Sequence, residues 1–188
     1  GYKPAGVLQN QAEADAYNAK YGENSNPGDL IFVDTNEDGV ITSDDRTKIG
    51  KPTPDWNFGL NFNADWKGFD FNVFFQGVSG ADIFDATWRQ DIASGNYPTW
   101  VLDRWTGEGT SNKLPLLKLG DSKNWVCSDI YVQDGSYLRL KNIALGYTLP
   151  RNLTKKVNID RFRVYVRAEN LFTWTKYWGF DPEICSGS

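Results

Sequence analysis

The sequence has no Met and no His among its 188 residues. Without His, His-dependent catalytic triads and His-ligated metal sites are excluded. Without an initiator Met, we expect the chain to be a piece of a longer protein. It also has no run of about twenty apolar residues, which excludes a membrane-spanning helix, and it has no signal peptide.

Cysteine is sparse as well, and the net charge is small. The net charge of −4, with no basic stripe, disfavours nucleic acid as a partner. The two cysteines, Cys127 and Cys185, fall in predicted loops. An external location would permit a disulfide, but the sequence gives no distance between them, so a disulfide and two unpaired thiols both stay open.

Aromatic residues, by contrast, are abundant, and they alternate with polar ones in two short runs. Residues 57–66 place Asn, Gly and Asp on one face of a strand and large apolar side chains on the other. The apolar set is Phe58, Leu60, Phe62, Ala64 and Trp66. Residues 69–76 repeat the alternation with one exception, Phe74, and Lys67-Gly68 joins the two runs as a tight turn.

Two explanations fit this alternation. Each run is about as long as a tilted strand needs to cross a bilayer, and a face of Asn, Asp and Gln suits a wet barrel lumen. A soluble antiparallel sheet with one buried face gives the same pattern. Two further alternating segments bring the predicted strands to four, at about 56–66, 69–77, 136–149 and 161–173, with a bulge expected near Asn142 where the phase slips.

The connections between these strands favour the membrane explanation. The long connection 78–135 and the tail 174–188 fall at one end of an up-and-down sheet, and the short links fall at the other, as in outer-membrane barrels. The predicted fold is therefore all-β, with antiparallel strands forming part of a large transmembrane β-barrel. We expect residues 1–55 to form an external loop region. Residues 56–188 would supply the barrel strands, with 78–135 and 174–188 as external loop and tail.

A shorter set of elements is predicted before the first long strand. Helix-forming residues at 11–21 followed by Gly22 predict a short helix. Asn26-Pro27-Gly28 predicts a turn, and Leu30–Val33 predicts a short strand.

Residues 34–45 match a twelve-residue calcium loop of the EF-hand type. Its positions 1, 3, 5, 7 and 12 supply oxygen ligands, and position 6 must be Gly, here Gly39. The predicted ligands are Asp34, Asn36, Asp38, the carbonyl of Val40, and Asp45. A polar turn without metal is the alternative. Because no long helices flank the loop, we expect bound Ca²⁺ to be structural.

Tryptophans in the long loop and tail form a second candidate site. Exposed aromatics near a barrel mouth could stack on sugar rings or contact a protein lid, whereas loop packing or interfacial anchoring is the alternative. The candidates are Trp88, Trp100, Trp105, Trp125 and Trp178. The loop carboxylates show no spacing that selects a catalytic pair, so we expect no enzymatic activity.

Several motifs, taken in order along the chain, resemble one family. They are Ile49-Gly50-Lys51-Pro52-Thr53-Pro54, Trp66-Lys67-Gly68-Phe69-Asp70, Phe75-Gln76-Gly77, Asp134–Asn142, Leu145–Pro150, Glu169–Thr173, Lys176-Tyr177 and Gly179–Glu183, and they follow the calcium-type loop. This set is similar to the C-terminal part of the SusC/RagA family of TonB-dependent outer-membrane transporters. The chain departs from the family pattern after Glu183, where the family carries a final strand.

The resemblance implies a function and partners. It implies a large barrel in the outer membrane of a Gram-negative bacterium, embedded in outer-membrane lipid, with a plug domain and a TonB-contact segment upstream. It also implies a SusD-like surface lipoprotein and nutrient uptake of oligosaccharides or peptides. The rival interpretation is a soluble calcium-stabilised glycan-binding module that uses the loop tryptophans.

Overall fold

The computed structural model describes residues 1–85, 96–97, 99–118, 120–124 and 126–183. The chain forms two compact units, one from Gly1–Lys51 with Phe84–Gln133 and one from Pro52–Ile83 with Asp134–Ser188. The long connection therefore packs with the N-terminal residues, whereas the sequence pattern had grouped it with the strands. Contacts between segments distant in sequence, described below, are the physical reason.

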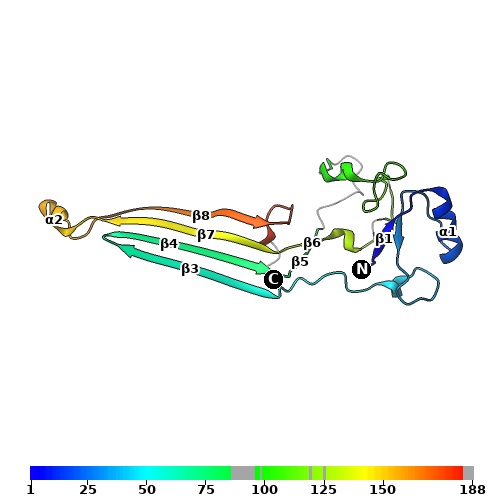
Figure 1. Cartoon of the computed structure of the whole chain (residues 1–188), viewed down its shortest axis with the longest axis horizontal. Helices are drawn as coiled ribbons and strands as arrows, with labels where there is room; N and C mark the ends of the chain where they lie inside the picture. Colours follow the sequence, from blue (N-terminus) through cyan, green and yellow to red (C-terminus); the bar gives the residue numbers. More distant parts are fainter. Residues whose placement is uncertain (86–95, 98, 119, 125, 184–188) are drawn as a thin grey trace. The chain divides into compact units, whose positions relative to one another are not determined.

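Figure 1 shows the elements in chain order. They are β1 (Pro4–Val7), α1 (Gln11–Tyr21), β2 (Leu30–Phe32), the 3-10 helix η1 (Ser43–Asp45), β3 (Trp56–Trp66), β4 (Phe69–Ser79), β5 (Asp82–Phe84), η2 (Thr99–Asp103), η3 (Asp129–Tyr131), β6 (Val132–Asp134), β7 (Tyr137–Thr148), α2 (Arg151–Thr154), η4 (Lys155–Val157) and β8 (Arg163–Thr175). Within the described residues no helix has the length and apolarity needed to cross a membrane.

The second unit contains a four-stranded antiparallel sheet in the order β3-β4-β7-β8. The four strands match the predicted ones to within two residues at each end. Lys67 and Gly68 join β3 to β4 with φ angles of 47° and 91°. Positive φ at both central residues is typical of the two-residue hairpin turn whose twist matches the twist of the paired strands.

A bulge interrupts the sheet near Asn142, as the slip in alternation predicts. Leu140 and Asn142 pair with neighbouring residues of β4, which leaves Lys141 as the extra residue. On the other side, Leu140 pairs with Phe172 and Asn142 with Glu169. Because one extra residue stands in β7, the apolar side chains before and after the bulge stay on the same face of the sheet.

Strand order fixes the ends at which the connections lie. The short turn Lys67-Gly68 and the link 149–162 are at one end of the sheet, and the connections before β3, between β4 and β7 and after β8 are at the other. This confirms the predicted asymmetry of the connections. A separate two-stranded sheet, β5 with β6, occupies the two stretches where the chain passes from one unit's sequence to the other's.

In the first unit, α1 and the β1–β2 pair form around two small clusters. The Asn10 side chain caps α1 by accepting from the Glu13 N–H at 3.0 Å, and Gly22 ends the helix with φ of 67°. One cluster contains Val7, Leu30 and Phe32, and the other contains Leu8, Ala14 and Tyr17; Ile41 packs against both. The helix 11–21, the turn at 26–28 and the strand at 30–33 are thus present as predicted.

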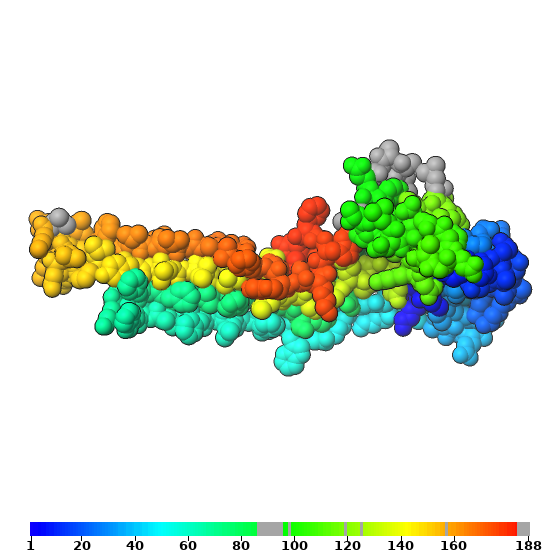
Figure 2. Space-filling view, turned by 45° about the horizontal axis from the view of Figure 1, so that its top comes forward, coloured from blue at the N-terminus to red at the C-terminus, as the bar shows by residue number. Residues whose placement is uncertain are grey.

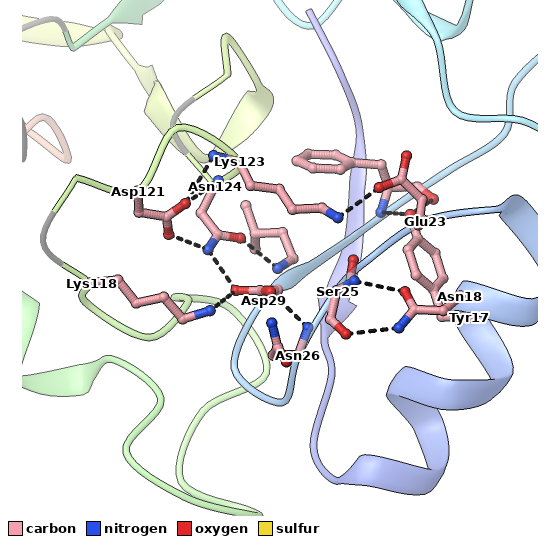
Figure 3. Close-up of polar contacts among 12 residues, drawn as sticks. Tyr17, Asn18, Glu23, Ser25, Asn26, Asp29, Lys118, Asp121, Lys123 and Asn124 are labelled. Carbon is pink, nitrogen blue, oxygen red and sulfur yellow. Dashed lines mark hydrogen bonds and ion pairs between the residues drawn. The ribbon is translucent and has the colours of Figure 1, made fainter.

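A polar network joins Lys118 and Asn124, from the long connection between β5 and β6, to Asp29 just before β2 (Figure 3). Asp29, which is 2% exposed, accepts hydrogen bonds from the Lys118 ammonium and the Asn124 amide. The Asn124 Oδ1 in turn accepts from the Leu30 N–H at 2.7 Å. Because these residues are about ninety apart in sequence, the network explains why the long connection belongs to this unit.

The Asp29 carboxylate stays charged in this setting. Burial raises its pKa, but hydrogen bonds from Lys118, Asn124 and the Asn26 N–H outweigh that effect and leave the pKa below its usual value. A depressed carboxyl pKa stabilises the fold above the unfolded pKa of about 3.9, and this contribution is lost as the pH falls through the folded value.

We therefore expect Asp29→Asn to lower the local stability of residues 28–32 at neutral pH by about 1.5–3 kcal/mol, the range for hydrogen bonds to charged groups. Amide hydrogen exchange of the intact protein measures this quantity. The difference from the wild type should shrink as the pH falls below about 4.

Glu23→Gln is the matched control, because Glu23 pairs with Lys123 at 2.6 Å where both side chains are partly exposed. Such a pair contributes at most about 1 kcal/mol. Equal effects of the two substitutions, or an Asp29→Asn effect that does not depend on pH, would contradict the assignment.

Candidate functional site: a two-faced sheet and a calcium-type loop

One face of the four-stranded sheet is apolar, and many of its large side chains are exposed, although Leu140 is buried. Trp56 and Val166 are each 74% exposed and Leu60 is 63% exposed. The space-filling view shows the strands side by side, with no other segment stacked on the visible face over most of their length (Figure 2). Strand pairing gives this face Trp56, Phe58, Leu60, Phe62, Ala64, Trp66, Phe69, Phe71, Val73, Phe75, Leu138, Leu140, Ile143, Leu145, Tyr147, Val164, Val166, Ala168, Phe172 and Trp174.

Aromatic side chains mark both ends of this apolar face. Trp56 lies at the first residue of β3, and Trp174 lies near the last residue of β8, at the same end of the sheet. At the opposite end, the rings of Phe69 and Tyr147 are 4.5 Å apart between centroids, next to Trp66. Between the two aromatic rows the face is almost entirely aliphatic or Phe.

The opposite face carries a chain of side-chain hydrogen bonds across all four strands. Asn72 of β4 donates to Asn63 and, at 2.9 Å, to Asn61, both on β3. Asn142 of β7 donates to the Asn72 Oδ1, and Arg167 of β8 donates to the Asn142 Oδ1 at 2.7 Å. Asn72 and Asn142 thus each serve as donor and acceptor, and the chain of bonds connects all four strands on this face.

An ion pair on the same face reaches over one strand. The Arg163 guanidinium of β8 donates twice to Asp70 of β4, with Nε to Oδ1 at 2.9 Å. Gly146 of β7 lies beneath it, and a Cβ there would come within 2.6 Å of both partners. A side chain at this position would therefore displace Arg163 or Asp70 from the present geometry of the pair.

Phe74, the exception in the alternation, is explained by Gly59. The Phe74 ring lies 3.2 Å from where a Gly59 Cβ would be, so it covers the glycine on the polar face. On the apolar face the Phe58 ring covers Gly77 in the same way, at 2.2 Å from the position of its absent Cβ. Large rings over strand glycines fill gaps that would weaken the sheet.

A clamp at the end of the sheet holds the tail that follows β8. The Arg139 side chain is buried and donates to Asp181 and Glu183 at 2.6 Å each, and to the Thr173 hydroxyl at 2.9 Å. Lys141 adds a further bond to Glu183. Arg139 and the Asp181–Glu183 pair belong to two motifs of the family resemblance, and spacing alone did not reveal that they meet.

The calcium-type loop is folded, and its first half resembles the expected turn. The Gly39 N–H donates to the Asp34 Oδ2 at 2.9 Å, and the Val40 N–H donates to the Asp38 Oδ1 at 3.0 Å. Gly39 has φ of 84°, the conformation for which position 6 requires glycine. The Asn36 amide bonds to Asp38 at 2.9 Å, so positions 3 and 5 lie side by side.

Asp45 closes the loop from its last position. It is fully buried and accepts from the N–H groups of Thr42 and Thr35 at 2.7 Å each. Hydrogen bonds from the backbone N–H groups hold the pKa of Asp45 below its usual value, although burial opposes them. The bond from Thr42 has the largest effect, and the bond from Thr35 has a smaller one. The loop is therefore shaped by a carboxylate that stays ionised.

Two observations bear on whether this loop fits a cation. The Asp34 Oδ1 is buried without a hydrogen-bond partner, and its carboxyl group neighbours that of Asp45, so positions 1 and 12 lie close together. Against this, the described residues contain no group of three or more His, Cys, Asp or Glu side chains arranged to hold a metal. The donor set fits calcium by oxygen type, because Asn36 and the Val40 carbonyl would complete it.

The candidate tryptophans do not form one surface. Trp88 and Trp125 lie outside the described residues. Trp105 is half-buried, packs against the Val7 cluster and donates to Gln9 at 3.2 Å, and Trp100 is half-buried in η2. Trp178 is exposed and belongs to the other unit.

The two cysteines are only half described. Cys127 is exposed, and Cys185 lies outside the described residues. Their pairing stays open.

Comparison with known proteins identifies relatives, although no family model matches the chain. It is 36% identical to TonB-dependent receptor P3 of Formosa agariphila over 185 residues, which cover 97% of this chain and 18% of that receptor. It is 31% identical to TonB-dependent receptor SusC of Bacteroides thetaiotaomicron, across 91% of this chain and 17% of SusC. The chain thus spans about a fifth of the length of these relatives.

Solved structures agree. The RagAB peptide importer in its open-open state matches 97% of this chain and 19% of the compared chain, with a TM-score of 0.69 and 28% identity. The closed-closed state of RagAB matches with a TM-score of 0.68. The resemblance drawn from the ordered motifs is thereby confirmed, and this chain is homologous over nearly its whole length to a segment of the TonB-dependent receptors of the SusC/RagA family.

Proposed function

We propose that the four-stranded sheet is part of the wall of an outer-membrane β-barrel that imports nutrients in a TonB-dependent manner. The observation that carries this proposal is the uncovered apolar face, bounded by aromatic residues at both ends and backed by a hydrogen-bonded polar face. Lipid would cover the first face, and a wet lumen would hydrate the second.

The exposed area argues against the soluble rival. Soluble monomers rarely expose contiguous apolar patches larger than a few hundred Å², and this face extends over four strands of 11 to 13 residues. A soluble glycan-binding module would leave those side chains in water. A single-layer sheet also has no core of its own, so it needs lipid or protein against it.

The edges of the sheet point to neighbouring strands in the whole protein. Among the described residues, β3 and β8 each pair on one side only. Unpaired backbone groups are not tolerated in a bilayer, because no water is present to bind them. Further strands would therefore continue the wall beyond both edges.

Orientation follows from the connections. Outer-membrane barrels place long loops outside the cell and short turns in the periplasm, so the end that carries the long connections would face outward. The unit formed by 1–51 and 84–133 would then be an external module. We propose that it contributes to contacts with a SusD-like lipoprotein and with oligosaccharide or peptide substrate. RagAB, one of the matched structures, is a peptide importer.

Two finer proposals concern sites in the loops. The loop 34–45 binds Ca²⁺ through Asp34, Asn36, Asp38, Val40 and Asp45, as a staple that holds Ile41 between the two apolar clusters of its unit. Among the tryptophans, exposed Trp178 is the better candidate for contact with substrate or lid, because Trp105 is held in packing.

Lipid exposure is tested by Leu60→Arg, near the middle of β3 on the apolar face. An arginine near the bilayer midplane should destabilise the whole transporter by about 2–4 kcal/mol. The measurement is reversible unfolding from lipid vesicles. Val164→Arg is the matched control, because Val164 is also exposed on this face but lies near the strand end, where the cost falls to about 0–1 kcal/mol. If water covers this face, both substitutions should stay within about 0.5 kcal/mol of the wild type.

Calcium binding is tested by Asp38→Ala. Loss of the ligand at loop position 5 should abolish the heat of Ca²⁺ binding to the intact protein in isothermal titration, and it should raise amide exchange in residues 30–55. Asp44→Asn removes a carboxylate from the same loop at a position that supplies no ligand, so it should keep the affinity. Unchanged affinity in Asp38→Ala would remove the site.

A further inference from the structure

The link between β7 and β8 is an ordered surface element at the short-turn end of the sheet. Pro150 is the N-cap residue of α2, and its carbonyl accepts from the Leu153 N–H at 3.0 Å. The Ile159 N–H donates to the Thr154 carbonyl at 3.1 Å. A bond from the Leu149 N–H to the Phe162 carbonyl, at 2.9 Å, closes the base of the link. Figure 1 shows α2 beyond the strand ends.

The charge of this link is strongly one-sided. Residues 150–162 contain four cations and one anion, which are Arg151, Lys155, Lys156 and Arg161 against Asp160, all exposed. Arg151 forms a solvent-exposed ion pair with Asp160 at 3.7 Å. The turn that contains Lys67 lies next to this link, because the Thr148 N–H donates to the Gly68 carbonyl at 2.7 Å. Lys67 therefore adds a further cation to this end of the sheet.

The same link exposes three large apolar side chains, Leu153, Ile159 and Phe162. Phe162 precedes β8 by one residue and keeps the alternation of Val164 and Val166, so it extends the apolar face beyond the strand. Cations beside exposed apolar residues are the composition of segments that lie in a membrane interface. Long Lys and Arg side chains can reach headgroups while their stems stay near the acyl boundary.

We propose that residues 150–162 lie in the membrane–water interface and bind the phosphate groups of anionic phospholipid through Lys155, Lys156 and Arg161. Leu153, Ile159 and Phe162 would enter the acyl boundary next to them. The proposal rests on the proposed function, because it requires the apolar face to be in lipid.

The opposite end of the sheet has a different balance of charge. There, Arg139 and Lys141 are paired with Asp181 and Glu183. That end also carries the carboxylates of Asp55, Asp82 and Asp134 and an exposed cation, Lys176. The charge difference between the two ends therefore selects the short-turn end for anionic headgroups.

The test compares the whole transporter in nanodiscs of phosphatidylcholine with nanodiscs that also contain phosphatidylglycerol. Native mass spectrometry gives the relative affinity for the two lipids, and amide exchange reports on residues 150–162. The wild type should prefer phosphatidylglycerol and should exchange more slowly in its presence. The variant Lys155→Gln/Lys156→Gln should lower that preference by about fivefold per lysine.

Lys176→Glu is the matched control, because it changes the net charge by the same two units at the opposite, exposed end of the sheet. It should leave the lipid preference unchanged. Equal losses in both variants would mean a general charge effect and would overturn the proposal. So would a wild type whose link exchanges at the same rate in both lipids, even if the lysine variant impaired uptake, because an acidic protein segment would then be the partner.

A second measurement, fluorescence quenching by the acyl chains, distinguishes failure of the headgroup site from failure of the proposed function. A fluorophore on Val166→Cys should be quenched by bromine-labelled acyl chains if β8 faces lipid. Quenching without a preference for phosphatidylglycerol overturns the headgroup site alone. Absence of quenching overturns the membrane wall and the headgroup site together.

Discussion

The constraint on which this structure depends is that its main sheet is a single layer. Backbone pairing across β3, β4, β7 and β8 satisfies the peptide groups between strands, but many of the large apolar side chains on one face stay exposed among the described residues. Burial of such a face normally supplies most of the free energy of folding. The sheet must therefore obtain that term from its surroundings, and a bilayer supplies an apolar solvent without requiring a second protein layer.

The polar face meets a different requirement. Amides on β3, β4 and β7 and a guanidinium on β8 bond to one another in sequence across the sheet. Such a network keeps polar groups satisfied where hydration is incomplete. The ion pair between Asp70 of β4 and Arg163 of β8 adds a contact between two strands that do not pair directly. It lies over Gly146 of β7, which has no side chain to occupy the space of the pair.

Several motifs that carry the family resemblance now have physical explanations. Lys67 and Gly68 both have positive φ and form the turn between β3 and β4. Gly146 leaves room above β7 for the ion pair between Asp70 and Arg163. Arg139 and the Asp181–Glu183 pair hold the tail against β7, although more than forty residues separate them. These motifs stabilise the end of the sheet and position the chain that leaves it.

The sequence by itself determined what depends on local periodicity and turn chemistry. Alternation placed the four strands, its slip placed a bulge near Asn142, and Gly22 and Gly68 marked a helix end and a turn, because these features depend on neighbours a few residues away. Only the tertiary structure decided that 84–133 packs with the first 51 residues, that Trp105 is held in packing, and that Arg139 meets Asp181. Those contacts join residues tens of positions apart, and spacing along a chain carries no information about which distant side chains meet.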